Sequence, residues 1–413
     1  MKPLAGIKIV DMTAFLAAPT APRIMGEWGA DVIKVEAPKG DPGRTQGAVF
    51  GTPCTDDENI GFDMSNLNKR FMTIDLREEA GREVMDKLLA DADVFVTSTR
   101  VKSLNKLGYD FESLHTRYPR LVMAQVLGFG AKGPLKDAAG FDMTAYMSRG
   151  GVLGTTLNRG AAPMLPTNGY GDFQVSFVLL SGILGALVQR ERTGEGDYVT
   201  TSLYHSGVFM LNTAMVSAQY GNSYPKDRRE VINPFNNAYF AGDGGLMTLC
   251  APEYDRDFDT VMKLIGREDL VGDERLNICG NINDNRLNGE VVDIMDEALA
   301  KQPMDHWLDL FRENDVPCEK CQLPGDVYDD EQAWANDVLR KVTYKTGAVR
   351  MIPTNPIRFQ SQGNPELRVS RGQGSDTEEI LVELGYRPEE IARLLKSGGV
   401  TGLFERTSPN QEA

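Results

Sequence analysis

A single aspartate at the start of a long apolar segment is the residue best placed to do chemistry in this sequence. Asp172 follows Gly169 and Gly171 and precedes the apolar run Val175 to Val188, which predicts a helix. A carboxylate there can cap the helix, because its oxygens accept hydrogen bonds from the free N–H groups of the first turn. It can also attack an activated acyl group, since the glycines before it let a ligand approach closely. The local residue types leave both interpretations open.

Two other patterns have the spacing of known sites without the context that those sites need. The loop from Gly128 to Gly133 matches the dinucleotide fingerprint GxGxxG, but Pro134 stands where a helix should begin directly. A glycine loop that passes close to a ligand is the simpler interpretation. Cys318 and Cys321 have CxxC spacing, but no second such pair exists in the sequence. We therefore expect no metal site and no tightly bound cofactor.

The first 130 residues alternate between apolar strands and helices. Strands are expected at 6–11, 31–36, 71–76, 93–97 and 121–126, and helices at 17–28, 78–92, 103–107 and 111–118. Strands joined by right-handed helical crossovers lie parallel in one sheet. The pattern predicts an α/β fold with a doubly wound, mostly parallel, Rossmann-like sheet. Ligands of such sheets bind outside the carboxyl ends of the strands.

Basic residues recur in the loops after these strands, although the chain as a whole carries a net charge of −15. That charge argues against nucleic acid or an anionic membrane as a partner. Lys39 follows the second strand, Arg77 the third and Arg100 the fourth. Each cation alone is compatible with solvated surface. Their recurrence at one edge of the sheet predicts a site for an anionic small molecule.

The length of 413 residues predicts more than one domain, because single cores stop growing at roughly 250–300 residues. A polar, proline-bearing stretch follows position 221, and a hairpin and several helices come after it. We expect a large domain at 1–221, a linker at 222–236, a small α+β domain at 237–323, a second linker at 324–346 and a C-terminal return to the large domain at 347–413.

The sequence favours a cytoplasmic protein. Lys8 and Asp11 interrupt the apolar core that a signal peptide would need. No run is expected to reach the ~20 apolar residues of a membrane span. Five cysteines in so long a chain make no disulfide framework, which suits a reducing compartment.

Eight segments in chain order resemble the family III CoA-transferases, the group that includes formyl-CoA transferase and carnitine CoA-transferase. They are PLAGIKIVDMT, GEWGADVIKVEAPKGDPGR, NLNKRFMTIDLR, GFGAKGP, GFDMTAY with RGG, YGD, TGEGDYVTTSL and ELGY. Two stretches, GFDMTAYMSRGGVLGT and DDEQAWAND, look most like the transferases for (R)-2-hydroxy acids such as phenyllactate and 2-hydroxyisocaproate. The resemblance implies an acyl-CoA and a carboxylic acid as substrates, and a homodimer of two interlocked ring-like chains.

The resemblance also implies roles for particular residues. The family's nucleophile is an aspartate that follows a glycine at the start of this helix, and Asp172 matches it. Its carboxylate would attack the donor thioester to form a mixed anhydride, and then an aspartyl-CoA thioester. A helix head is expected to hold this carboxylate ionised. The family's CoA contacts match Leu16, Ala17, Ile74, Asp75, Leu76, Arg77, Ser98, Thr99, Arg100, Lys106, Ala139, Gly140, Phe141 and Asp142.

Three other functions stay open at this point. The related α-methylacyl-CoA racemases have a histidine before the aspartate in a GHD motif, whereas this chain has Phe141, which cannot take a proton. A nucleotide-binding dehydrogenase would need glycines after the first strand, where residues 13–18 contain none. In a non-catalytic CoA-binding module, Asp172 would have its capping role alone.

Overall fold

The computed structural model describes residues 1–404, which fall into two compact units. Unit 1 comprises residues 1–153, 165–216 and the described chain from 332 onward, and unit 2 comprises 154–164 and 217–331. The chain therefore leaves unit 1 and returns to it twice. The short excursion at 154–164 had no sign in the sequence.

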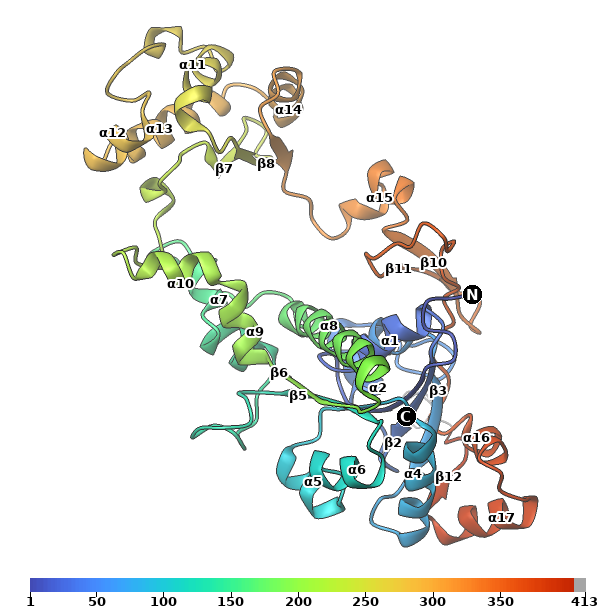
Figure 1. Cartoon of the computed structure of the whole chain (residues 1–413). Coiled ribbons are helices and arrows are strands. Elements are labelled where there is room, and N and C mark those ends of the chain that lie inside the picture. The colour runs from blue at the N-terminus through green and yellow to red at the C-terminus, as the bar shows by residue number, and fades with distance from the viewer. Residues whose placement is uncertain (405–413) are drawn as a thin grey trace. The chain divides into compact units, whose positions relative to one another are not determined.

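Unit 1 is built on a seven-stranded sheet in the order β12-β3-β2-β1-β4-β5-β6 (Figure 1). Its strands are β1 (Lys8–Met12), β2 (Asp31–Glu36), β3 (Arg70–Ile74), β4 (Val94–Thr97), β5 (Val122–Leu127), β6 (Tyr198–Ser202) and β12 (Val400–Thr401). The first six pair in parallel, and β12 pairs antiparallel with β3 at one edge. The expected large, mostly parallel sheet of an α/β fold is confirmed.

Helices cover both faces of this sheet, as Figure 1 shows. One apolar cluster joins α1 and α8 to side chains such as Ile9 and Val94, and a second joins α4, α5, α6, α16 and α17 to their neighbours Val10 and Phe95. Successive side chains of a strand point to opposite faces, so the two clusters lie on the two sides. Because both faces are buried, β4 and β5 are buried along their whole length.

The helical segments of unit 1 include several short turns. Their bounds are α1 (Thr20–Glu27), α2 (Gly43–Gln46), η1 (Gly47–Phe50), α3 (Ile60–Asn66), α4 (Glu79–Asp91), α5 (Val101–Leu107), α6 (Phe111–Arg117), the π-helix η2 (Asp142–Arg149), α7 (Val152–Thr155), α8 (Tyr170–Thr193), α9 (Leu203–Met210), α10 (Asn212–Ala218), α15 (Glu331–Ala335), α16 (Thr377–Glu383) and α17 (Pro388–Ser397). Helices α7, α10 and α15 cross the boundary between the units. A separate hairpin of β10 (Leu339–Thr343) and β11 (Val349–Pro353) also belongs to unit 1.

Helix α8 corrects the expectation about long apolar runs. Its 24 residues are apolar enough, at a mean hydropathy of 1.7, to pass for a membrane span by length and composition. In this structure α8 packs against β5 and β6, and Val175, Leu179 and Ile183 are buried in the core of unit 1. An apolar helix of this length can cross a lipid bilayer, but α8 instead buries its apolar residues in the core of unit 1.

Unit 2 has its own core. A three-stranded antiparallel sheet contains β7 (Asn236–Phe240), β8 (Leu246–Cys250) and β9 (Cys318–Lys320). The helices are η3 (Arg228–Glu230), α11 (Tyr254–Leu264), η4 (Glu268–Leu270), α12 (Cys279–Asp284), α13 (Asn288–Leu299), α14 (Met304–Glu313) and η5 (Asp326–Tyr328). Phe235, Phe258 and Trp307 lie in its buried cluster. The expected hairpin and the smaller α+β arrangement are both present.

Candidate active site

The first turn of α8 is capped by a residue other than the one expected. The N-cap of α8 is Gly169, whose φ of 89° is left-handed, and Asp172 lies inside the first turn. Asp142, the first residue of η2, supplies the acceptors. Its Oδ2 accepts from the Gly169 N–H at 2.8 Å, and its Oδ1 accepts from the Gly171 N–H at 3.0 Å. The capping interpretation of Asp172 is therefore wrong, because Asp142 satisfies these N–H groups.

Gly171 lets η2 and α8 meet this closely. A Cβ at position 171 would lie 2.3 Å from a ring carbon of Tyr146 and 2.5 Å from Oδ1 of Asp142, so no side chain fits there. The Tyr146 hydroxyl donates to Oε1 of Gln174 at 2.6 Å, one turn further along α8. The two helices are thus locked together on both sides of Asp172.

The carboxylate of Asp172 is half-buried and has no donor. Within residues 1–404 no hydrogen bond reaches its oxygens, and only its backbone carbonyl accepts a bond, from Ser176 Oγ at 3.0 Å. Burial, and next the negative charge of Asp142, raise the pKa of Asp172 to about 7. The expectation that the helix head holds this group ionised is wrong, because desolvation without a compensating donor outweighs the favourable end of the helix.

Asp172 faces a cavity of about 230 Å³ at the carboxyl ends of the parallel strands. Loops after β1, β4 and β5 and the start of α9 line it, so the cavity lies at the edge where ligands of such sheets bind. Six sequence candidates line the cavity together with Asp172: Ala17, Ser98, Arg100, Ala139, Gly140 and Phe141. The structure thus brings together residues that lie up to 155 positions apart in the chain.

The other sequence candidates do not line this cavity. Asp142 is buried beneath it, and Leu16 and Thr99 are neighbours of lining residues. Ile74 is the last residue of β3, and Asp75, Leu76 and Arg77 follow it, three strands away from β4 in the sheet. Lys106 is exposed in the last turn of α5. Arg77 is occupied within its own loop, where Nη2 pairs with Oδ2 of Asp75 at 2.6 Å.

Eight cavity residues were not among the site candidates of the sequence: Ala14, Phe15, Val126, Leu127, Gly128, Lys136, Ala138 and Leu203. Four of them, Ala14, Phe15, Gly128 and Lys136, lie in loops that follow predicted strands, where the rule about carboxyl ends already predicts ligand binding. Gly128 and Gly140 come into backbone contact, since a Cβ on Gly128 would lie 2.8 Å from the Gly140 Cα. This contact brings residues 138–141 against the end of β5. No helix follows the GxGxxG loop before η2, which removes the dinucleotide interpretation.

The turn between β1 and α1, which forms one wall of the cavity, is held by hydrogen bonds from several elements. The Ala14 N–H donates to Ser98 Oγ at 3.1 Å, and the Phe15 N–H donates to Oδ1 of Asp41 at 3.1 Å. Lys34 pairs with Oδ2 of Asp41 at 2.9 Å. The turn also explains why α1 begins at Thr20 and not at residue 17, because the residues before it run non-helically along the cavity.

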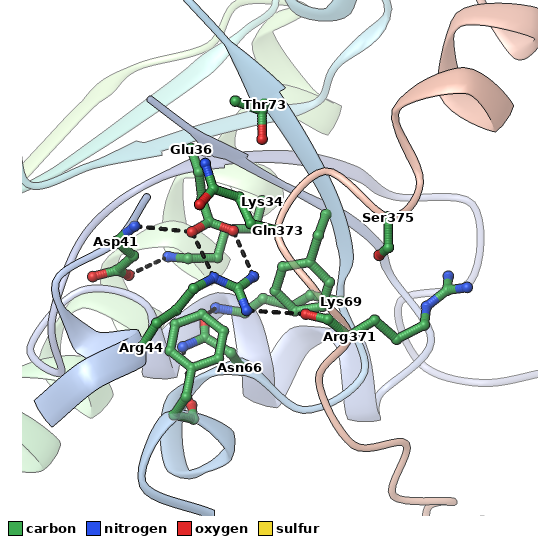
Figure 2. A network of polar contacts seen from close by, with 12 residues as sticks. Lys34, Glu36, Asp41, Arg44, Asn66, Lys69, Thr73, Arg371, Gln373 and Ser375 are labelled. Atoms are coloured by element: carbon green, nitrogen blue, oxygen red, sulfur yellow. Dashed lines mark hydrogen bonds and ion pairs between the residues drawn. The ribbon is translucent and has the colours of Figure 1, made fainter. Parts of the chain in front are cut away.

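A network of buried charged side chains supports this turn, and Figure 2 shows part of it, including Lys34, Asn66 and Lys69. The Lys69 ammonium lies 2.7 Å from Oδ2 of Asp11, and it also donates to the Pro19 carbonyl at 2.8 Å and to Oδ1 of Asn66 at 2.9 Å. Lys34 donates to the carbonyl of Thr13 at 3.0 Å. Two buried lysines therefore hold the two ends of the turn through backbone carbonyls.

The charges of the network are balanced. Burial raises the pKa of Asp11, but the attraction of Lys69 and Lys34 outweighs it, so that pKa lies below its ordinary value. Burial lowers the pKa of Lys69 to about 7, against the opposing pull of Asp11. Further along, Arg44 donates to both oxygens of Glu36 at 2.8 and 2.6 Å. These groups pair with one another, and none of them lines the cavity of Asp172.

The cysteines do not form a metal or disulfide site in the described chain. All five are free, and residues 1–404 contain no group of three or more His, Cys, Asp or Glu side chains that could hold a metal ion. Cys318 lies half-buried on β9, and Cys321 is exposed after it. The group of the site that can react is Asp172, a carboxylate that faces a cavity with Arg100 and Lys136 in its lining. Such a group can act as a nucleophile or as a base.

Comparison with known proteins identifies the family to which this chain is similar. Residues 4–373 match CoA-transferase family III. The chain is 41% identical over 395 residues to the cinnamoyl-CoA:phenyllactate CoA-transferase of Clostridium sporogenes, covering 95% of this chain and 96% of that protein. It is 39% identical over 390 residues to the (R)-2-hydroxy-4-methylpentanoate CoA-transferase of Clostridioides difficile, covering 94% and 97%.

A solved structure agrees with these sequence matches. The crystal structure of a CAIB/BAIF family protein from Brucella suis superposes with a TM-score of 0.77 at 28% identity, over 93% of this chain and 99% of that one. The fold and the sequence lead to one assignment. The chain belongs to CoA-transferase family III.

Proposed function

We propose that this enzyme moves CoA from an acyl-CoA donor to an (R)-2-hydroxy acid, with Asp172 as the covalent carrier. One observation carries the proposal: the Asp172 carboxylate has no hydrogen-bond donor within the described residues and faces a cavity at the ligand-binding edge of the sheet. The choice of acid is supported by the two relatives named above, whose substrates are 2-hydroxy acids by name.

The transfer would run in four balanced steps. The Asp172 carboxylate attacks the thioester carbonyl of the donor, the C–S bond breaks, and CoA leaves as a thiolate from the mixed anhydride. The thiolate attacks the Asp172 carbonyl of that anhydride, which releases the donor acid and leaves an aspartyl-CoA thioester. The acceptor carboxylate attacks this thioester and frees the thiolate again. The thiolate then attacks the acceptor carbonyl, so acceptor-CoA forms and Asp172 is regenerated.

The raised pKa of Asp172 suits this chemistry. A carboxylate without hydrogen bonds keeps its lone pairs available for attack. A substrate bound in the cavity would exclude the water that hydrolyses an anhydride. The N–H groups of Gly169 and Gly171 at the head of α8 could bind a developing oxyanion only if Asp142 released them. We therefore assign Asp142 a positioning role and not direct contact with CoA.

We propose that Arg100 and Lys136 attract the anionic part of CoA, because they are the basic residues that line the cavity. The loop Ile74–Arg77 and Lys106 are proposed as outer contacts for the phosphates, on the basis of the resemblance alone. The five free cysteines fit a cytoplasmic enzyme.

We also propose that the sheet is wound in the Rossmann manner and that two chains interlock, with 222–236 and 324–346 as linkers. Light scattering during size-exclusion chromatography should give twice the mass of the chain. A stable folded monomer would contradict the interlocked dimer.

Trapping of the intermediate tests the covalent role of Asp172. The protein is incubated with cinnamoyl-CoA, treated with hydroxylamine and digested for peptide mapping. We expect a hydroxamate at Asp172, because hydroxylamine cleaves both the anhydride and the aspartyl thioester. The matched control is Asp142→Asn, which should still give the hydroxamate at Asp172. Full turnover by Asp172→Ala, or a hydroxamate at another residue, would contradict the proposal.

A further inference from the structure

Two phenylalanine rings stand at the cavity that Asp172 faces. Phe15 and Phe141 meet edge to face, with ring centroids 5.8 Å apart and an interplanar angle of 88°. Both line the cavity, and both are exposed, at 36% and 55%. Exposed apolar side chains that adjoin one another, unlike single scattered ones, often mark a ligand-binding groove.

The backbone of Phe15 adopts a conformation that a bulky residue avoids. Its φ is 63°, in the left-handed region, and Phe15 is the only aromatic residue with a positive φ in the described part of the chain. The Asp41 carboxylate fixes this conformation by accepting the Phe15 N–H at 3.1 Å, and Lys34 in turn holds Asp41. Backbone strain that surrounding side chains maintain is typical of functional sites. We therefore interpret the left-handed φ of Phe15 as a means of placing its ring at the cavity.

The cavity has room for a third ring. An apolar cavity of roughly 150 Å³ binds benzene, and the cavity here measures about 230 Å³. Besides the two phenylalanines, the apolar lining consists of Val126, Leu127 and Leu203 and of alanines such as Ala14, Ala17 and Ala138. The two phenylalanines are the only aromatic side chains among the described residues that line the cavity, so they provide the ring surface for a group attached to Asp172.

We propose, resting on the transfer through Asp172, that Phe15 and Phe141 form the pocket for the acyl side chain and select 2-hydroxy acids with an aryl group. An aryl substrate would complete a cluster of three rings in edge-to-face contact, which a branched aliphatic chain cannot do. Phe15 is then a specificity-determining residue whose position depends on Asp41.

A competition assay tests this assignment. Phenyllactate and 2-hydroxyisocaproate compete for CoA from cinnamoyl-CoA in one reaction, so that the product ratio gives the ratio of the two kcat/KM values. The wild type should favour phenyllactate. Phe15→Leu and Phe141→Leu should each shift the ratio toward the aliphatic acid by about fivefold, which corresponds to the loss of one ring pair. Phe15→Tyr keeps the ring and should keep the ratio.

Phe359→Leu is the matched control. Phe359 is 37% exposed and also meets its neighbour Trp28 edge to face, but it does not line the cavity. An equal shift in Phe15→Leu, Phe141→Leu and Phe359→Leu, or a wild type without preference for phenyllactate, would overturn the assignment. If Phe15→Leu does not fold, Phe141→Leu gives the deciding ratio, because its ring is the more exposed.

The assay separates two kinds of failure. A wild type that forms the Asp172 hydroxamate but shows no change of ratio in the variants refutes the pocket and leaves the proposed function intact. A wild type that transfers CoA to neither acid, with no hydroxamate at Asp172, refutes the proposed function and the pocket with it.

Discussion

Two aspartates of unit 1, Asp11 and Asp172, show how differently burial acts on the same side chain. Asp11 is fully buried on β1, yet its pKa lies below the ordinary value because Lys69 and Lys34 compensate for the loss of water. Asp172 is only half-buried, yet burial and then the negative charge of Asp142 raise its pKa to about 7, because no cation of the described chain compensates for the loss of water. The partner of a carboxylate, more than its depth, decides its ionisation here.

The two aspartates therefore have different roles: one helps to hold the fold, and the other can react. The network of Asp11, Lys34 and Lys69 has its charges paired and holds the carbonyls of the turn before α1. The carboxylate of Asp172 is unpaired in the described chain and reaches the cavity. Paired buried charges are costly to break but take no part in a reaction, whereas an unpaired carboxylate is costly to keep and ready to react.

The largest effect should come from Asp172→Asn. The amide cannot form the anhydride, so kcat should fall by about 10⁴-fold or more. The measurement is steady-state CoA transfer from cinnamoyl-CoA to phenyllactate. A residual rate within tenfold of the wild type would remove Asp172 from the nucleophile's role.

The same variant should not lose stability. The folded-state pKa of Asp172 lies above its ordinary value of 3.8, so ionisation of this group destabilises the fold increasingly as pH rises from about 4 to about 7. Asp172→Asn removes this penalty. Its melting temperature should exceed that of the wild type at pH 8, and the gain should shrink toward pH 4. A lower melting temperature at pH 8 would show that the carboxylate has stabilising partners after all.

Lys69→Met, in contrast, should lower the stability of the fold. The substitution leaves Asp11 buried with one lysine nearby instead of two, and it removes the hydrogen bond to the Pro19 carbonyl. The free energy of unfolding should therefore fall by about 3–5 kcal/mol. Urea denaturation measures it. The control is Lys8→Met, which breaks an exposed pair with Asp91 at 2.5 Å and should cost less than about 1 kcal/mol. Equal losses in the two variants would show that the network does not stabilise the turn.

The pH dependence of the rate should report the same unpaired carboxylate. Asp172 must be ionised to attack, and with a pKa of about 7 only about one molecule in a hundred is ionised at pH 5. The kcat/KM should therefore fall roughly a hundredfold from pH 8 to pH 5. A profile that stays flat down to pH 5 would place the pKa of Asp172 near its ordinary value.

The sequence allowed much of this frame to be predicted. Apolar runs located the five parallel strands of the first 130 residues within two residues at each end, because a strand covered on both faces is largely apolar. The helix Pro388–Ser397 carries a sequence signal at both ends, because a proline begins it and Gly398 ends it. Local signals of this kind need no knowledge of the fold.

The contacts that define the site could not be predicted in this way. Asp142 and Gly171 are 29 positions apart, and Lys69 and Asp11 are 58 apart, so nothing local indicates which charges will meet. The raised pKa of Asp172 depends on Asp142 and on a burial that only the packed structure sets. The left-handed φ of Phe15 has no sequence signature either, since residues with that conformation are usually glycine.

The smallest predicted effect concerns Asp142, which both holds the head of α8 and influences the ionisation of Asp172. Its carboxylate accepts two N–H groups at the head of α8, and its negative charge is the second cause of the raised pKa of Asp172. Asp142→Asn keeps one oxygen acceptor and removes the charge. The midpoint of the pH–rate profile should therefore move to lower pH, while burial continues to hold it above the ordinary value of 3.8.

Asp110→Asn is the control for that shift. Asp110 likewise accepts a backbone N–H at a helix start, from Ser113 at 3.1 Å, but it lies outside the cavity and should leave the midpoint unchanged. If Asp142→Asn lowers the rate at every pH without moving the midpoint, its carboxylate acts by holding Gly169 and Gly171 alone. A moved midpoint would mean that the negative charge of Asp142 also sets the pKa of the nucleophile. The hydrogen bonds of Asp142 to the backbone cannot do this, because only its charge repels the ionised form of Asp172.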